Sequence, residues 1–325
     1  MEIREYYIFT DNKRWVFGSL FLALILLSPI IFLAISFFSG SKTTLLYLLD
    51  NVLLDYTLNT IYLIIITSFF ALILGVFPAW IISNYIFFGR KFFDIVLYLP
   101  LAIPSYIMGF TYIDILSYTG PIQSYLRDTS PYLAEIFNKD YLQIEVLGVL
   151  LGLALYPYVY TASRISFSLI GSNYVNISKN LGLSTFQTFY KVILPLSRPA
   201  IFSGLFLVIM EVLNEYGAVK YFGVNTYTTG IFRSWFSFGD VSGAIQLACI
   251  LLAIVLLFFI LDRFSIKNSK FYYQKNSQIQ KMKLTNWKKS IFMFSVCFIP
   301  FFFGFLVPFF FILNNAIQTY SLTNF

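Results

Sequence analysis

Residues 176–195 read NISKNLGLSTFQTFYKVILP and form the centre of a polar segment (residues 167–198) set between two long apolar runs. Within it, Gly182 is followed after nine residues by Val192-Ile193-Leu194-Pro195. Glycine tolerates the backbone angles at which helices end, and proline lacks the amide hydrogen that a helix interior needs. An ordered basic segment that stays in water, in a chain otherwise suited to lipid, indicates a docking site for another molecule.

The composition indicates an integral membrane protein. Of the 325 residues, 58% are hydrophobic and 11% are charged, whereas soluble domains are about 25% charged. The sequence has no histidine, which excludes imidazole metal ligands, proton relays and histidine-based triads. Cys249 and Cys297 both lie in apolar runs, so we expect small buried side chains rather than a disulfide. The sequence therefore predicts no catalytic residues, no metal site and no cofactor.

Seven apolar runs are long enough to cross a membrane. A hydrocarbon core about 30 Å thick needs roughly 20 apolar helical residues, and backbone groups in lipid are satisfied only within helices or closed barrels. The predicted fold class is therefore an all-α polytopic membrane protein. The runs lie near residues 15–39, 57–87, 92–118, 143–166, 199–219, 241–262 and 290–314.

The basic residues predict the orientation of these spans. With the N-terminus in the cytoplasm, seventeen of the 22 lysines and arginines fall in cytoplasmic segments, as the positive-inside rule requires. This distribution explains the net charge of +7 by attraction to anionic membrane lipid. Nucleic acid is therefore not expected as a partner.

The order of the runs predicts a repeated organisation. We interpret residues 1–265 as a first six-span unit and residues 266–289, which are rich in lysine and glutamine, as a cytoplasmic linker. Residues 290–325 resemble the start of the chain, since in both a tryptophan precedes an apolar run that contains proline. We interpret them as an incomplete second unit with one span. A truncated or split form of a longer two-unit protein is the resulting hypothesis.

Local signals divide the polar segment. Gly182 is suited to the junction of two short helices, Leu194-Pro195 is expected to end the segment, and Pro199 to lie in the first turn of the next span. The predicted product is a short helix along the membrane surface. An ordinary amphipathic interfacial helix is the alternative interpretation. The side chains expected on display are Phe186, Phe189 and Tyr190, with Lys179 and Lys191 around them.

The polar segment resembles the loop signature of ABC-importer permeases, Glu-Ala-Ala-x-x-x-Gly followed nine residues later by Ile-x-Leu-Pro. Gly182, Leu194 and Pro195 match this signature, and Asn176-Ile177-Ser178 stands where Glu-Ala-Ala is usual. In that family the loop forms a coupling helix that inserts into a cleft on the ATP-binding subunit. The resemblance implies that the ATPase-coupling residues are Asn176, Gly182, Phe186, Phe189, Lys191, Leu194 and Pro195.

Two further stretches resemble the ferric-iron branch of that family. One is LPLAIPSY (99–106) with GFTY (109–112), and the other is EYGAV (215–219), FGVNTYTTGI (222–231) and RSWF (233–236). The resemblance implies a six-helix type I importer unit over residues 1–265 plus one further transmembrane helix. Ferric permeases of this type are typically fused two-unit chains, in agreement with the repeat after residue 290.

The resemblance also implies a function and its partners. It predicts the permease subunit of a ferric-iron importer in a bacterial inner membrane, without enzyme activity of its own. An ABC ATP-binding subunit would hydrolyse ATP, and a periplasmic or lipid-anchored substrate-binding protein would dock near residues 220–240. A second permease unit, as a homodimer partner or a separate chain, would complete the pathway.

Two prolines are candidates for the translocation path. Pro100 and Pro104 remove backbone donors in mid-span, so this helix must kink or break. Broken helices occur at membrane depth only where they are buried in protein or line a cavity. A kink that serves packing alone is the alternative to a role in the path.

Acidic residues near the predicted outer ends of the spans are the second set of candidates. Glu211 and Glu215 lie four apart, on one face of a helix, and would line the path near the outer gate. Alternatively they reach interfacial water or pair with Lys220 or Arg233. We interpret Asp114 as an interfacial group.

Other functions remain open at this level. Within ABC importers, a polyamine, thiamine or molybdate substrate is compatible with the same motifs. A secondary transporter coupled to protons or sodium is less favoured, because its acidic sites cluster at the midplane rather than near the outer ends. A non-transporting remnant that lacks the second unit is the third alternative.

Overall fold

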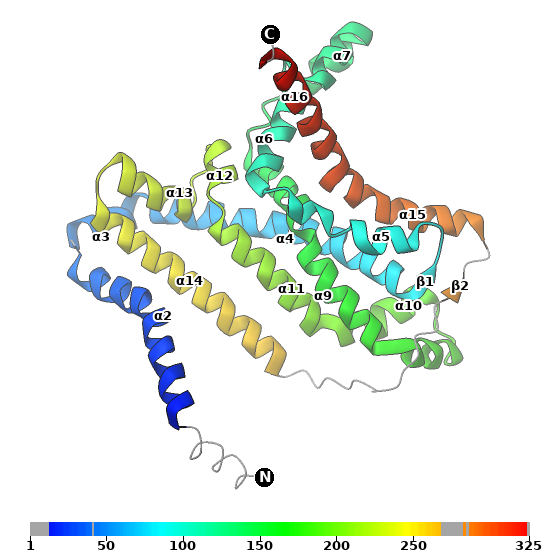
Figure 1. The fold of residues 1–325 in the computed structure, drawn as a ribbon, viewed down its shortest axis with the longest axis horizontal. Helices are drawn as coiled ribbons and strands as arrows, with labels where there is room; N and C mark the ends of the chain where they lie inside the picture. Colours follow the sequence, from blue (N-terminus) through cyan, green and yellow to red (C-terminus); the bar gives the residue numbers. More distant parts are fainter. Residues whose placement is uncertain (1–12, 41, 268–281, 284–285, 324–325) are drawn as a thin grey trace. The chain divides into compact units, whose positions relative to one another are not determined.

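The computed structural model describes residues 13–40, 42–267, 282–283 and 286–323, and the regular secondary structure in these ranges is helical apart from one short strand pair (Figure 1). The predicted all-α class is confirmed. The elements before the central helix are α2 (Lys13–Ser39), α3 (Lys42–Asn51), α4 (Leu53–Asn84), β1 (Tyr85–Ile86), α5 (Arg90–Val96), η1 (Leu99–Ala102), α6 (Ser105–Leu116), α7 (Pro121–Thr129) and α8 (Pro131–Phe137). The others are α9 (Ile144–Asn180), α10 (Thr185–Thr188), η2 (Phe189–Ile193), α11 (Leu194–Asn214), α12 (Gly217–Tyr221), α13 (Tyr227–Phe232), η3 (Arg233–Ser237), α14 (Val241–Lys267), β2 (Met282–Lys283), α15 (Trp287–Phe301), η4 (Phe302–Leu306) and α16 (Val307–Thr323).

Six helices among the described residues are long and apolar enough to span a membrane, and they coincide with six of the seven predicted runs. The run at 92–118 is instead a pair of helical stretches, Arg90–Ala102 and Ser105–Thr129, bent by 91° at their junction. The break predicted from Pro100 and Pro104 is therefore present. Ile103 adopts an extended conformation there, as expected for a residue that precedes proline.

The chain divides into two compact units, residues 1–54 with 230–253 and residues 55–229 with 254–325. In the first, the start of α14 packs against the N-terminal helices. The Cys249 thiol hydrogen-bonds the Leu33 carbonyl of α2 at 3.4 Å. A Cβ atom on Gly40 would lie 2.9 Å from the Ser242 hydroxyl, so side chains of α14 approach the backbone closely at this glycine.

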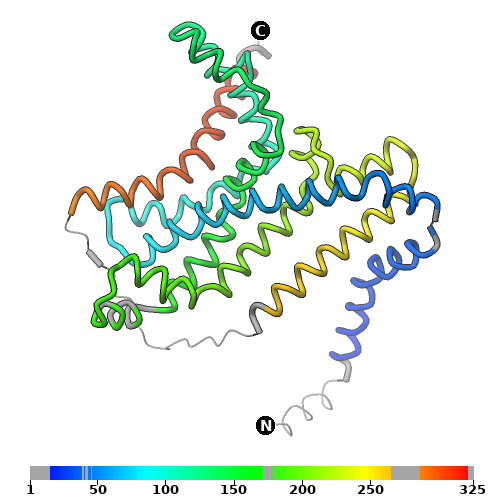
Figure 2. The backbone as a smooth tube through the Cα atoms, turned by 180° about the vertical axis from the view of Figure 1, so that it is seen from behind, coloured from blue at the N-terminus to red at the C-terminus, as the bar shows by residue number. Residues whose placement is uncertain are grey.

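In the second compact unit, residues 55–229 with 254–325, α9 is the central helix, and α4 and α11 pack against it (Figure 2). Tyr156, Val159 and Tyr160 of α9 are fully buried. Gly75 of α4 and Gly204 of α11 both approach α9 beside Val159. An added Cβ on Gly75 would lie 2.9 Å from the Val159 Cβ, and one on Gly204 would lie 3.0 Å from the Val159 Cα. In lipid the hydrophobic effect does not drive helices together, so their association depends on close packing, which small residues allow.

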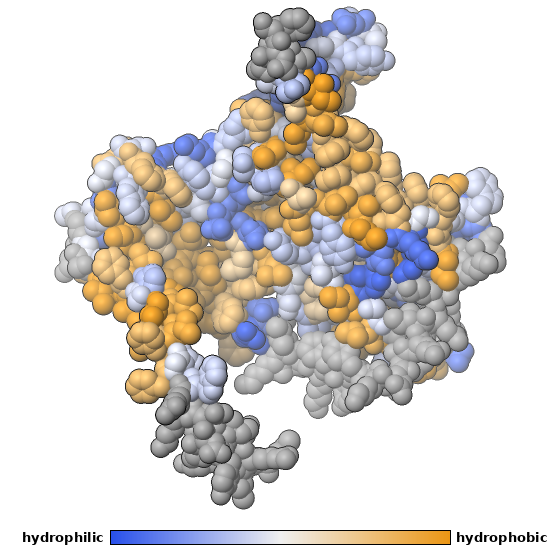
Figure 3. All heavy atoms as spheres, in the orientation of Figure 1, coloured by the Kyte–Doolittle hydropathy of each residue, from blue (hydrophilic) through white to orange (hydrophobic). Residues whose placement is uncertain are grey.

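The seventh apolar segment belongs to the second compact unit. It forms one helical stretch, α15 to α16, which begins at Trp287 rather than at the predicted residue 290 and contains a π-helical turn, η4. The Tyr112 hydroxyl donates a hydrogen bond to the Phe303 carbonyl, and a Cβ on Gly304 would lie 3.0 Å from the Pro100 ring. Hydrophobic side chains cover the exposed face of α15 and α16 (Figure 3).

The predicted linker is only partly described. Residues 268–281 and 284–285 lie outside the described residues, whereas β2 pairs in parallel with β1, Tyr85 opposite Met282 and Ile86 opposite Lys283. The boundaries predicted at residues 265 and 290, and the assignment of residues 290–325 to a second unit, stay predictions.

Candidate functional site

The polar segment begins as a continuation of α9, which extends to Asn180 and not to the predicted span end at residue 166. Gly182 then adopts φ 81°, as its position predicted. The Leu183 amide donates to the Ser178 carbonyl at 3.0 Å, the six-residue ring of a glycine-terminated helix. A Cβ on Gly182 would meet no atom within 4 Å, so glycine is required by the backbone angle and not by crowding.

The next helix starts at once because it has its own cap. The Ser184 hydroxyl accepts from the Gln187 amide at 3.3 Å, and the Gln187 side chain accepts from the Ser184 amide at 2.9 Å. This reciprocal capping box holds α10 in place beside Gly182. The sequence reasoning missed it, although Ser-x-x-Gln directly after a glycine is a readable signal.

The predicted end of the segment at Leu194-Pro195 is wrong. The helix from Thr185 continues to Asn214, with a π-helical turn, η2, immediately before the proline. Pro195 has no amide hydrogen and its ring would crowd the carbonyl four residues earlier, and the wider turn relieves both problems. Pro195 therefore lies in the first turn of α11, the place predicted for Pro199, which is inside the helix.

Of the three aromatic residues predicted to be displayed, one is buried and two are exposed. Phe189 is 6% exposed and packs on Trp80 at 5.0 Å between ring centroids, so the prediction that it is displayed is wrong. Phe186 and Tyr190 are 72% and 64% exposed and stack on each other at 6.5 Å. Lys191 is exposed as predicted. The side chains of Asn176 and Lys179 lie outside the described residues.

Tyr85 connects the start of α10 to the end of α4. Its side chain is 6% exposed and hydrogen-bonds the side chain of Thr185. Burial raises the pKa of the Tyr85 hydroxyl more than the hydrogen bond lowers it, so the phenol stays neutral. The polar segment is thus attached to α4 by a hydrogen bond at Tyr85 and by ring packing at Trp80.

An ion pair that the sequence reasoning missed joins α5 to α9. The Arg164 guanidinium binds the Asp94 carboxylate through two atoms, at 3.0 and 3.2 Å. Arg90 lies 3.8 Å from the same carboxylate, and the Tyr160 hydroxyl donates to it at 3.4 Å. An aspartate in an apolar run and an arginine next to another run were the available signal. The orientation argument counts Arg164 among the seventeen basic residues of cytoplasmic segments, but it lies within α9 and is therefore not a loop residue.

The two prolines of the broken span have different surroundings. Pro100 is buried, and Gly304 of η4 approaches its ring. Pro104 is exposed and precedes the first residue of α6. The bend is therefore packed on one side and open on the other, and the assignment of both residues to a translocation path stays a prediction.

Glu211 and Glu215 do not share a helix face, because α11 ends at Asn214 and Glu215 is extended. Glu211 is exposed and accepts from the Tyr158 hydroxyl at 3.1 Å. The Glu215 carboxylate accepts from the Ser105 hydroxyl and from the Ala218 amide, the latter at 2.9 Å. It thereby joins the starts of α6 and α12. The place of these residues at an outer gate stays a prediction.

Part of the 220–240 segment is tied to α4. The Tyr227 hydroxyl and the Thr57 hydroxyl lie 2.6 Å apart, and the Asn59 amide donates to the Asn225 carbonyl at 3.0 Å. Thr226 and Thr229 are buried and hydrogen-bonded to each other. A binding-protein surface in this segment would therefore consist of other residues.

Glu215→Ala is expected to lower the free energy of unfolding by about 1–2 kcal/mol, as for the loss of a helix cap. Glu215→Gln keeps a hydrogen-bond acceptor and should lose less stability, and Glu211→Gln is the control at an exposed position. Thermal unfolding in detergent measures the stability of all three variants. If Glu215→Gln keeps its stability but loses uptake, the residue lines the path; if uptake follows stability, it only joins α6 to α12.

Residues 71–268 match the family described as binding-protein-dependent transport system inner membrane component. An Fe(3+)-transport system permease protein of Haemophilus influenzae is 30% identical over 199 residues, 61% of this chain and 35% of that protein. A sulfate transport system permease protein of Escherichia coli is 29% identical over 164 residues, 49% of this chain and 55% of that protein. A molybdate/tungstate transport system permease protein of Methanocaldococcus jannaschii is 28% identical over 236 residues, 72% of this chain and 90% of that protein.

Solved structures agree in fold. A bacterial ABC transporter involved in alginate import has a chain with TM-score 0.61 and 18% identity, covering 81% of this chain and 100% of its own. The inward-facing MetNI methionine ABC transporter has one with TM-score 0.52 and 12% identity, covering 67% of this chain and 96% of its own. At these identities the likeness shows a shared fold alone.

Proposed function

Because the chain belongs to the inner membrane component family of binding-protein-dependent transport systems, we propose that it is the permease subunit of an ABC importer for ferric iron in a bacterial inner membrane. An ATP-binding subunit hydrolyses ATP, and a substrate-binding protein outside the membrane delivers the cargo. A second permease unit, either another copy of this chain or a separate chain, completes the path. The N-terminus lies in the cytoplasm.

The observation that carries this proposal is the stacked, exposed pair Phe186 and Tyr190 on a rigid turn. Gly182 and the Ser184 cap hold the backbone on one side, and buried Phe189 holds it on the other. Solvent-exposed aromatic pairs on a fixed backbone are typical anchors for a partner pocket. We assign the ATP-binding subunit as that partner.

The same geometry supports a lever mechanism. The polar segment is continuous with α9 at one end and with α11 at the other, with only residues 181–184 between the two helical stretches. Closure of the ATP-binding subunits on ATP would move this segment, and with it two central helices. The spans would then change between outward- and inward-facing states through differential binding of the partner to each.

An oxyanion is the second candidate substrate, because two of the relatives are sulfate and molybdate/tungstate permeases with identities close to that of the iron relative. Uptake of radiolabelled ferric iron, sulfate and molybdate in cells with and without the gene distinguishes the two. We expect iron uptake alone to depend on the chain; dependence of sulfate or molybdate uptake instead would replace iron as the substrate.

The test of the importer assignment is co-purification from native membranes in mild detergent. The tagged wild-type chain should recover an ATP-binding subunit, and the Phe186→Ser/Tyr190→Ser double variant should lose it. Tyr125→Ser/Tyr132→Ser removes two exposed tyrosines elsewhere, 67% and 73% exposed, and should retain the partner. If the wild type recovers no ATP-binding subunit, the chain is a remnant or a transporter of another class.

A further inference from the structure

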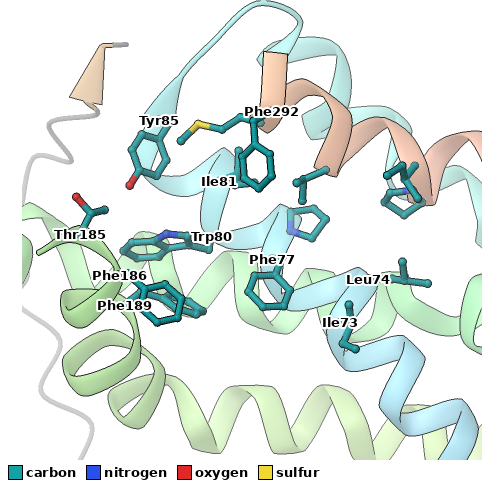
Figure 4. Close-up of a pocket in the computed structure, with 15 residues that line it drawn as sticks. Ile73, Leu74, Phe77, Trp80, Ile81, Tyr85, Thr185, Phe186, Phe189 and Phe292 are labelled. Carbon is teal, nitrogen blue, oxygen red and sulfur yellow. The ribbon is translucent and has the colours of Figure 1, made fainter. Parts of the chain in front are cut away.

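An apolar groove of about 610 Å³ runs between α4, the polar segment and α15 in the second compact unit. Figure 4 shows Phe77 and Trp80 of α4 and Phe292 of α15 among its lining side chains, with Phe186 and Phe189 of the polar segment at its lower edge. Its volume is in the range of about 300–1,000 Å³ that is usual for small-molecule sites. The ion pair lies outside this groove, and of the proposed partner-binding pair only Phe186 lines it.

The polar groups of the groove are confined to one end. Tyr85 and Thr185 carry the only side-chain hydroxyls of the lining, and they lie together there (Figure 4). Ile73 and Leu74, both aliphatic, lie at the end of the groove far from Tyr85 (Figure 4). A ligand that fits must be a long hydrocarbon with its polar group at the Tyr85 end.

The length of the groove matches one leaflet of a bilayer. Ile73 lies eleven residues before Asn84, the last residue of α4, which corresponds to about 16 Å at the rise of a helix, and Tyr85 follows directly in β1. Half of the hydrocarbon core is about 15 Å. Phe77 and Phe292 line the groove and are 44% and 66% exposed, so an occupant of the groove would add packing contacts to both rings.

Basic residues lie at the polar end. Lys288 and Lys289 are exposed and precede Phe292 and Met293 of the groove by one helical turn, so they share the face of α15 that forms the wall. Lys191 is exposed but lies two residues after the groove-lining Phe189, on a different face of the polar segment, and is not part of the groove. Lysines at a membrane surface attract anionic phospholipid headgroups.

We propose that this groove binds one acyl chain of an anionic phospholipid of the cytoplasmic leaflet, with its headgroup at Lys288 and Lys289. The leaflet rests on the proposed orientation of the chain. The bound acyl chain would fill the space between α4, α15 and Phe186, and would so pack against the polar segment on the side of the groove. A helix of a second copy is the alternative occupant.

Trp80 provides the test, because it lines the groove and is otherwise only 7% exposed. In a variant with Trp15, Trp235 and Trp287 changed to Phe, its fluorescence reports contact with lipid. We expect phosphatidylglycerol with brominated acyl chains, in nanodiscs, to quench Trp80 at a mole fraction roughly tenfold lower than brominated phosphatidylcholine, because of the lysines. The readout needs neither ATP nor a partner, so it is independent of the importer assignment.

Two variants fill the groove from opposite walls. Val296→Phe on α15 and Ile73→Phe on α4 should each reduce the quenching, and Ile65→Phe, a 59% exposed position of α4 outside the groove, should not. Absence of quenching in the unfilled protein would overturn the proposal, as would quenching that the filling variants leave unchanged. Equal quenching by both lipids would overturn the choice of an anionic headgroup. Absent quenching together with cysteine cross-linking of Val296→Cys between copies would assign the groove to a second copy of the chain.

Discussion

Gly182→Trp is expected to reduce substrate uptake at least roughly tenfold while the chain still inserts in the membrane. The residue has φ 81°, where a side chain costs about 1–2 kcal/mol in backbone energy. The surrounding space is open, so the indole would not clash within the chain but would occupy the surface assigned to the ATP-binding subunit. Uptake of radiolabelled iron and the ATPase activity of the reconstituted complex measure the effect.

Two milder variants separate strain from bulk. Gly182→Asn should retain most of the uptake, since asparagine tolerates left-handed angles, and Gly182→Ala should fall between Asn and Trp. Gly18→Trp is the matched control, because a Cβ there also meets no atom within 4 Å and the backbone is helical. Wild-type uptake in Gly182→Trp would contradict both the coupling role and the docking surface.

The Asp94–Arg164 ion pair is expected to stabilise the packing of α5 on α9. The interaction energy between the two residues is measured with single variants and the double variant. Asp94→Ala removes the carboxylate that Arg164 binds, and Arg164→Ala leaves Asp94 with the longer 3.8 Å contact to Arg90, in a site where the Asp94 and Arg164 side chains are 30% and 19% exposed. We expect each to lower the free energy of unfolding by about 1–3 kcal/mol. Arg164→Lys should also lose stability, because an ammonium cannot make the two parallel hydrogen bonds of a guanidinium.

The double variant Asp94→Asn/Arg164→Gln should be closer to wild type than either alanine variant, since two neutral amides replace the bidentate pair and only Arg90, at the longer distance of 3.8 Å, loses its charge partner. Thermal unfolding in nanodiscs and iron uptake are the measurements, and Lys91→Ala, an exposed position of the same helix, is the control. If the effects of the single changes Asp94→Asn and Arg164→Gln add up without interaction, the pair makes no contribution beyond its separate residues.

Both the break at Pro104 and the turn at Gly182 were predictable, because each depends on one residue and its chain neighbours. The bend of 91° follows from two prolines within five residues, and φ 81° from a glycine after a helix. The end of α9 was not predictable from hydropathy. Polarity marks where a helix leaves lipid, but α9 continues to Asn180 because its backbone bonds are internal and need no lipid.

Partners distant in sequence could not be predicted. Asp94 and Arg164 are 70 residues apart, and nothing in either local pattern selects the other. The same holds for Phe189, which has the character of its neighbours Phe186 and Tyr190 but is buried on Trp80. A helical period specifies which residues share a face, yet it does not specify which helix covers that face.

The sequence by itself determined that this is a polytopic helical membrane protein, where its spans lie, where one of them breaks and where a glycine turns the chain. These properties depend on local composition and on single residues with restricted backbones. Only the tertiary structure decided which aromatic rings are exposed, which charges pair, and that α4, the polar segment and α15 enclose an apolar groove. These properties arise from the close packing of segments far apart in the chain, whose side-chain shapes select each other only when the helices meet.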